Sequence, residues 1–198
     1  MDTMHRSPAS TNLPVVEEGQ ADAEVSLLYD QFRSRFGRQD LPGILKCFAT
    51  HPPLLRNMMD IAEAVLFAEG HLTRRHKEMI AAFVSEQNHC PYCADSHGYR
   101  LRLQGGSAEA LCALQENDLR SPALTTVEQS LLRFVEKINR SSHEIARADV
   151  DLLIENGWRG PQIAEAVHVA ALYAAFNRIA NGFGLRSQGL LAFFERST

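Results

Sequence analysis

The segment HCPYCADSHGYRLRLQGG, residues 89–106, carries the side chains best suited to chemistry. Cys90 and Cys93 are separated by two residues, and His97 follows Cys93 by four positions. Pro91 suits the first position of a helix, so we expect Cys90 near the N-cap and Cys93 in the first turn. A helix N-terminus favours the thiolate, which is the reactive form of cysteine. This short helix therefore offers a dithiol with a histidine one turn along the same face, where it can exchange protons.

A carboxylate comes from the preceding segment, residues 73–88, which we predict to be a helix with Thr73 as its cap. Its large apolar side chains form one stripe, and Glu78 lies on the opposite side with the small residues Ala82 and Ser85. Small residues allow another helix to approach closely. We expect Glu78 to be half-buried and to meet His97 beside the cysteines as a proton acceptor. A solvated glutamate is the simpler alternative.

The cysteine pair has two other readings. Zinc could be bound by the C-P-x-C unit with His97 and either His89 or Glu78, but the chain has no second C-x-x-C unit. Two inert helix cysteines are the other alternative. No histidine follows Cys93 directly, which excludes c-type haem attachment. We expect no bound metal.

Bulk composition narrows the class of protein. The chain has 198 residues, 45% apolar and 22% charged, with a net charge of −4. This fits one globular domain and argues against a nucleic-acid binder. No apolar run has the length of a signal peptide or a bilayer span, so we expect no membrane association and a cytoplasmic location. The other two cysteines, Cys47 and Cys112, are expected to be buried and inert.

The hydrophobic pattern is helical nearly throughout, and no alternating strand pattern stands out. We predict an all-α single domain of about eight to ten helices over residues 21–198, after an N-terminal arm at residues 1–20. The arm is either mobile or an extended strap on a partner subunit. The expected helices cover residues 22–36, 42–49, 52–69, 73–88, 91–104, 107–115, 125–139, 147–156, 161–181 and 187–195.

Two of these helices predict a homo-oligomer. The segment 161–181 is apolar nearly all round, and 52–69 carries apolar residues beyond one stripe. A chain of 198 residues has few places where both can be central, so we expect one to be covered by a partner subunit. The alternative is that 161–181 is the centre of the domain's own core. His168, on that helix, is expected to be a core histidine.

The combined spacing resembles a known family. Glu78, eleven residues, Cys90, two residues, Cys93, three residues and His97 look like the core signature of the AhpD-like superfamily, which contains the alkylhydroperoxidase AhpD proteins and the carboxymuconolactone decarboxylases. The stretch LTRRHKEMIAAFVSEQNHCPYCADSHGYRLRLQGG is similar to the peroxidase-related branch in particular. The resemblance extends over roughly residues 23–191.

This resemblance implies an oligomeric AhpD-like helical bundle that reduces hydroperoxides. It makes Cys93 the peroxidatic and Cys90 the resolving cysteine, with Glu78 and His97 as the proton relay. An external dithiol would be the reductant; no flavin or haem is implied, and no dinucleotide fingerprint is present. Tyr92 departs from AhpD proteins, where this position is often histidine. The alternatives are a carboxymuconolactone decarboxylase-type lyase and a non-enzymatic redox-sensing or assembly protein.

Overall fold

A computed structural model describes residues 11–197 of the chain, and over these residues it contains ten α-helices and no strand. The predicted all-α fold is therefore confirmed. The first ten residues of the predicted N-terminal arm lie outside the described residues. The α-helices are α1 (Ala23–Phe36), α2 (Gly43–Phe48), α3 (Pro52–Ala62), α4 (Arg74–Gln87), α5 (Pro91–Leu103), α6 (Ala108–Gln115), α7 (Thr126–Ser141), α8 (Arg147–Glu155), α9 (Gly160–Phe183) and α10 (Leu190–Ser197).

Local side-chain chemistry sets where several helices begin. The side chains of Asp22, Thr73, Ser107 and Thr125 each accept a hydrogen bond from the backbone N–H three residues later, at the start of α1, α4, α6 and α7. Such a bond satisfies one of the free N–H groups in the first turn. At Thr125 the Glu128 carboxylate also accepts from the Thr125 backbone, which completes the predicted capping box.

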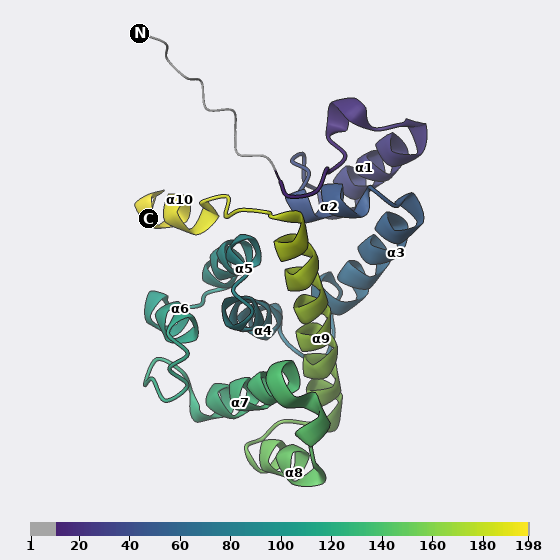
Figure 1. The fold of residues 1–198 in the computed structure, drawn as a ribbon. Helices are drawn as coiled ribbons and strands as arrows, with labels where there is room; N and C mark the ends of the chain where they lie inside the picture. The colour runs from purple at the N-terminus through teal and green to yellow at the C-terminus, as the bar shows by residue number, and fades with distance from the viewer. Residues whose placement is uncertain (1–10, 198) are drawn as a thin grey trace.

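Helix α4 is the centre of the molecule. Every residue from 77 to 85 is buried, and α4 packs against α5 and α9 and more lightly against α6 and α7. Figure 1 shows α9 as the long upright helix, with α1–α3 on one side of it and α4–α7 on the other. The expectation of a half-buried Glu78 is too weak, because this side chain is completely buried.

Helix α9 has one face that the described part of the chain leaves exposed. Ala164, His168, Ala171 and Ala175 are exposed along it, whereas Val169 and Tyr173 are buried. The prediction that His168 belongs to the core is therefore wrong. Alanines surround the histidine on both faces of the helix, so the sequence offered no contrast in polarity between the buried and the exposed side.

The predicted helix over residues 52–69 is divided. Helix α3 passes into a single π-helical turn, η2 (Glu63–Phe67), in which the Ala68 N–H donates to the Glu63 carbonyl at 2.7 Å. Such turns are rare and widen a helix locally. Here the turn ends with Phe67, which borders the cavity described below.

The described part of the N-terminal arm packs against the rest of its own chain. It contains one 3₁₀ turn, η1 (Glu18–Gln20), and a second such turn, η3 (Ser142–Glu144), follows α7. The Asn12 N–H donates to the Phe183 carbonyl at 2.8 Å, and the Tyr29 hydroxyl donates to the Val16 carbonyl at 2.6 Å. Residues 11–16 therefore join the end of α9 to α1.

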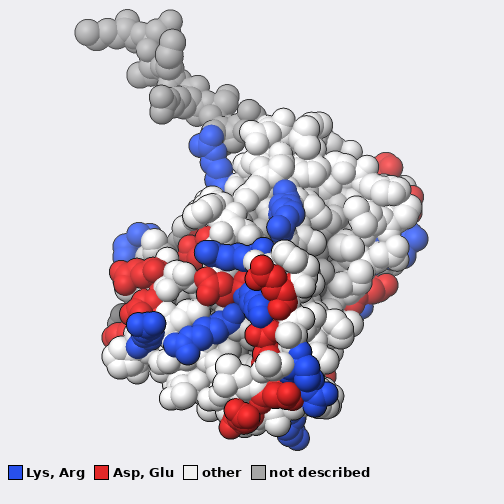
Figure 2. All heavy atoms as spheres, turned by 60° about the horizontal axis from the view of Figure 1, so that its bottom comes forward, with Lys and Arg blue, Asp and Glu red and all other residues white. Residues whose placement is uncertain are grey.

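Charged side chains on the visible surface do not gather into a patch of one sign. On the face in Figure 2, basic and acidic side chains are interspersed over one part, and a broad adjoining part carries no charged side chain. Among the described residues, no helix has the length and hydropathy needed to cross a membrane.

Candidate active site

The turn between α4 and α5 places the cysteines. The Cys90 N–H donates to the Ser85 carbonyl at 2.9 Å and closes the end of α4, while His89 adopts a positive φ of 49°. This is the left-handed cap common at helix C-termini. Helix α5 begins at Pro91 with Cys90 as its N-cap residue, so Cys93 lies in the first turn, as the sequence predicts. The chain reverses within three residues, and α5 packs closely along α4.

The two thiols form one buried unit. Cys90 and Cys93 are 1% and 4% exposed, and their side chains hydrogen-bond to each other. The bond from Cys93, with help from the first-turn amides of α5, lowers the pKa of Cys90 in spite of its burial. The same bond and burial raise the pKa of Cys93. When the pair loses one proton, the negative charge therefore rests on Cys90 and Cys93 donates the remaining proton to it.

Asn177 of α9 is a site residue that the sequence analysis did not select. It is completely buried and hydrogen-bonds both cysteine side chains, lowering the pKa of each. Its Nδ2 donates to Ser85 Oγ at 2.9 Å, and its Oδ1 accepts from Asn88 Nδ2 at 3.0 Å. An amide within the apolar stretch of α9 was the available signal, since such a group requires partners when it faces the interior.

Glu78 and His97 meet as expected. Glu78 Oε2 lies 2.6 Å from His97 Nδ1, and Arg74 Nη2 lies 2.6 Å from Glu78 Oε1. Burial would raise the pKa of Glu78, but the charges and hydrogen bonds of His97 and Arg74 together lower it. Glu78 is thus a fixed carboxylate that orients the His97 ring, and Tyr173 packs edge-on against this ring at 4.4 Å between centroids. Cys93 lies one turn before His97 on α5.

A cavity of about 120 Å³ opens beside this pair. Tyr92 and His97 line it, whereas the two cysteines do not; they pack with Tyr92 in a small cluster that includes Ile44, Ala180 and Leu185. The Tyr92 hydroxyl accepts a hydrogen bond from the Ile44 N–H at 3.3 Å. Burial raises the pKa of Tyr92 to about 12, so it is a neutral wall residue rather than a base.

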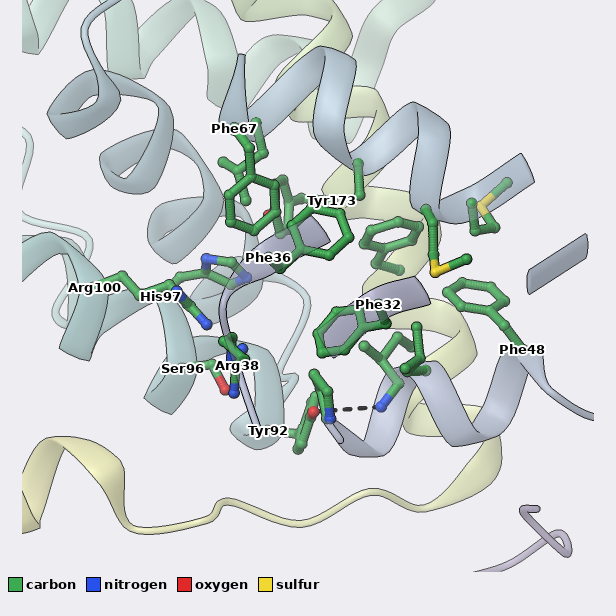
Figure 3. Close-up of a pocket in the computed structure, with 18 of the residues that line it drawn as sticks. Phe32, Phe36, Arg38, Phe48, Phe67, Tyr92, Ser96, His97, Arg100 and Tyr173 are labelled. Carbon is green, nitrogen blue, oxygen red and sulfur yellow. Dashed lines mark hydrogen bonds between the residues drawn. The ribbon is translucent and has the colours of Figure 1, made fainter. Parts of the chain in front are cut away.

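The cavity has an apolar and a polar side. Figure 3 shows Arg38, Ser96, His97 and Arg100 on one side, with Phe48 at the opposite end. Ser96, His97 and Arg100 follow Cys93 on α5 at spacings of three, four and seven, which is one helix face. That spacing was a readable signal for Ser96 and Arg100. The apolar side includes Phe32, Phe36, Phe48, Met58, Met59, Leu66, Phe67, Tyr173 and Phe176.

The other chemical candidates are not part of this site. Among residues 11–197, no group of three or more His, Cys, Asp or Glu side chains is placed to hold a metal ion. Cys47 is buried as expected, and burial raises its pKa to about 12. Cys112 is exposed, so the expectation that it is buried is wrong; it lies on the outer face of the short helix α6. His89 is also exposed.

The segment that carries the candidate site is similar to a known family. Residues 52–137, which include the dithiol, Glu78 and His97, match the carboxymuconolactone decarboxylase family. No curated protein matches the chain.

Solved structures share the fold. An alkylhydroperoxidase AhpD core, an uncharacterized peroxidase-related protein from Ralstonia eutropha JMP134, is 24% identical, with a TM-score of 0.82 over 93% of this chain and 96% of that one. An uncharacterized peroxidase-related protein from Silicibacter sp. TM1040 is 26% identical, with a TM-score of 0.76 over 91% and 93%. The debrominase Bmp8, solved with 2,3,4-tribromopyrrole, is 14% identical, with a TM-score of 0.73 over 96% and 100%. The chain therefore resembles the carboxymuconolactone decarboxylase family over residues 52–137 and shares its fold with AhpD-like, peroxidase-related proteins.

Proposed function

We propose that this protein is a thiol-dependent hydroperoxide reductase. The observation that carries the proposal is the buried, hydrogen-bonded Cys90–Cys93 pair at the start of α5, one turn before a histidine held by a buried carboxylate. This arrangement supplies a nucleophile, a second thiol to form a disulfide, and a group that can move protons. A lyase of the decarboxylase type would need no such dithiol.

In the first step the Cys93 sulfur attacks the outer oxygen of a hydroperoxide ROOH. The Cys93 proton passes to the Cys90 thiolate along the hydrogen bond between them. The O–O bond breaks, Cys93 becomes a sulfenic acid, and the leaving alkoxide takes a proton from the His97–Glu78 pair to give ROH. Tyr92 and His97 line the cavity, so the peroxide approaches from that side.

In the second step Cys90 passes the proton that it received from Cys93 to the His97–Glu78 pair, and its sulfur attacks the Cys93 sulfenic acid. A disulfide forms, and the departing hydroxide takes this proton from the pair and leaves as water. The balance is two thiols and ROOH to one disulfide, ROH and H₂O. An external dithiol then reduces the disulfide by exchange and is itself oxidised. Since this cycle needs a reducing environment, we also propose a cytoplasmic location.

Thiol titration with peptide mass spectrometry tests the proposal. We expect one equivalent of peroxide to remove two thiols per chain and to link Cys90 to Cys93, with Cys47 unchanged. Cys112→Ser removes the exposed thiol and should behave like the wild-type protein. Cys90→Ser should accumulate a sulfenic acid at Cys93 that dimedone traps.

No loss of free thiols with hydrogen peroxide or with an organic hydroperoxide would contradict the proposal. It would favour a decarboxylase-type lyase or a non-enzymatic protein.

A further inference from the structure

The cavity beside His97 is suited to an organic molecule. Its walls are largely apolar and include five phenylalanines and two tyrosines, and its volume of about 120 Å³ approaches the roughly 150 Å³ of an apolar cavity that holds benzene. Hydrogen peroxide needs no such space and gains nothing from contact with aromatic rings. The expected occupant therefore has an apolar body of about one ring or a short alkyl chain.

Charges at the polar side are not balanced. Arg38 is paired with Asp40 at 2.6 Å, and Arg74 is paired with Glu78. Within the described part of the chain, the Arg100 guanidinium takes part in no hydrogen bond and no ion pair. Three arginines therefore face two carboxylates, and the excess positive charge belongs to Arg100.

Arg100 is also partly buried. Burial is the main cause that lowers the pKa of its guanidinium, and the nearby Arg38 acts in the same direction, while Glu78 opposes the shift. A partly buried, unpaired guanidinium is stabilised by a bound anion, because guanidinium and carboxylate pair through two parallel hydrogen bonds. Figure 3 shows Arg100 beside Ser96 and His97 at the edge of the cavity.

We propose that this cavity binds a small organic anion, with its carboxylate on Arg100 and its apolar body against the aromatic wall. This inference rests on the proposed function, and the preferred substrate is then an organic hydroperoxide that carries a carboxylate. Arg100 follows His97 by three residues, a rise of about 4.5 Å along α5. Such a molecule is therefore held within one helical turn of the proton-carrying pair.

Binding is measured by calorimetry on the reduced protein, with phenylacetate and its uncharged isostere phenylacetamide as probes. We expect phenylacetate to bind more tightly. Arg100→Gln should weaken phenylacetate about ten- to a hundredfold, the range for a charged hydrogen bond, and change phenylacetamide less than about twofold. Arg100→Lys keeps the positive charge but not the planar pair of N–H donors, so its affinity for phenylacetate should lie between those of the wild-type protein and Arg100→Gln. Arg120→Gln is the matched control, because Arg120 is exposed and forms no ion pair with the residues that the structure describes.

Equal binding of the two probes by the wild-type protein would overturn the inference, and this comparison needs no variant to fold. An equal loss of both probes in Arg100→Gln would overturn it as well. The result is independent of turnover, because calorimetry needs no peroxide. Loss of thiols with organic hydroperoxides together with equal probe binding would contradict only the anion site. Selective phenylacetate binding without thiol oxidation would contradict only the reductase.

Discussion

Single residues set the chemistry of the dithiol. The Cys90 sulfur accepts hydrogen bonds from the first-turn amides of α5 and from Cys93, and these bonds stabilise the Cys90 thiolate. Asn177 binds both sulfurs from α9, and the Glu78 carboxylate orients the His97 ring. Each of these groups has at least one hydrogen-bond partner inside the protein, which helps to order the site before any peroxide arrives.

Glu78→Gln should slow peroxide-dependent thiol oxidation about ten- to a thousandfold, the usual range for loss of general acid–base catalysis. Glutamine fills the same space but holds the His97 ring without a negative charge. Stopped-flow measurement of thiol loss tests this, with Glu69→Gln, at an exposed position, as control. An unchanged rate would limit Glu78 to a structural role.

Glu78 should also make the protein sensitive to acid. Its pKa is lowered in the folded state, so its ionisation stabilises the fold above the ordinary glutamate pKa of about 4.3. This contribution is lost as the pH falls through the lowered value, because protonation breaks the contacts to His97 and Arg74. Urea unfolding between pH 7 and pH 3 should show a steeper loss for the wild-type protein than for Glu78→Gln. Parallel curves would contradict this.

Asn177→Ala should reduce the reactivity of the dithiol and destabilise the fold by about 1–3 kcal/mol, because Ser85 and Asn88 lose a buried partner. The pKa of Cys90 should rise, since Asn177 lowers it in the native site. The pH dependence of iodoacetamide alkylation measures this pKa. Arg178→Ala, at the adjacent exposed position, is the control. An unshifted alkylation profile would show that Asn177 only holds α9 in place.

At the level of elements, one buried ion pair joins α9 to α4. Lys77 Nζ lies 2.6 Å from Glu165 Oε1 and donates to the Ala68 carbonyl at 3.0 Å. The other Glu165 oxygen accepts from the His71 and Leu72 N–H groups at 2.6 and 2.7 Å. The Glu165 carboxylate therefore holds the loop that precedes α4 in place against α9.

Glu165→Ala should destabilise the protein by about 3–5 kcal/mol, because it leaves Lys77 charged and unpaired at 1% exposure. Adding Lys77→Met should recover a large part of the loss, since it removes the buried charge. Urea unfolding measures both, and Glu155→Ala at the exposed end of α8 is the matched control. A double variant as unstable as the single one would assign the loss to the loop contacts instead.

A substitution in the turn at His89 should increase the stability of the fold. A non-glycine residue at a φ of 49° costs about 1–2 kcal/mol, while glycine adopts it freely but loses more entropy on folding. His89→Gly should therefore stabilise the protein by up to about 1 kcal/mol, and His89→Val should destabilise it. Thermal unfolding of the two variants tests this, and a lower melting temperature for His89→Gly would contradict it.

At the scale of the whole molecule, α9 presents an uncovered stripe of Ala164, Ala171 and Ala175, and α8, which packs against α9, exposes Leu152 and Ile154. Small residues allow a second helix to approach closely, so we expect a homo-oligomer through this face. Sedimentation equilibrium at micromolar concentration should give a multiple of 22.1 kDa, and Ala171→Arg should shift it toward the monomer. A single species at 22.1 kDa for the wild-type protein would contradict this.

The sequence by itself determined the features that depend on neighbours within one helical turn. Caps at Asp22, Thr73, Ser107 and Thr125, and the Cys90–Pro91 start of α5, are set by backbone groups three or four residues away. Helical spacing also put Cys93 and His97 on one face. The resemblance carried by these spacings extended the prediction to the superfamily.

Only the tertiary structure decided which helix is central and what lies beyond the dithiol. Whether Glu78 is half or fully buried, and whether His168 or Asn177 faces inward, depends on how α4, α5 and α9 pack. Alanine-rich helices have little contrast in polarity between faces, so their orientation is fixed by the sum of many small contacts along the whole helix. The cavity and the unpaired Arg100 arise where segments distant in sequence meet, and local spacing cannot encode such a space.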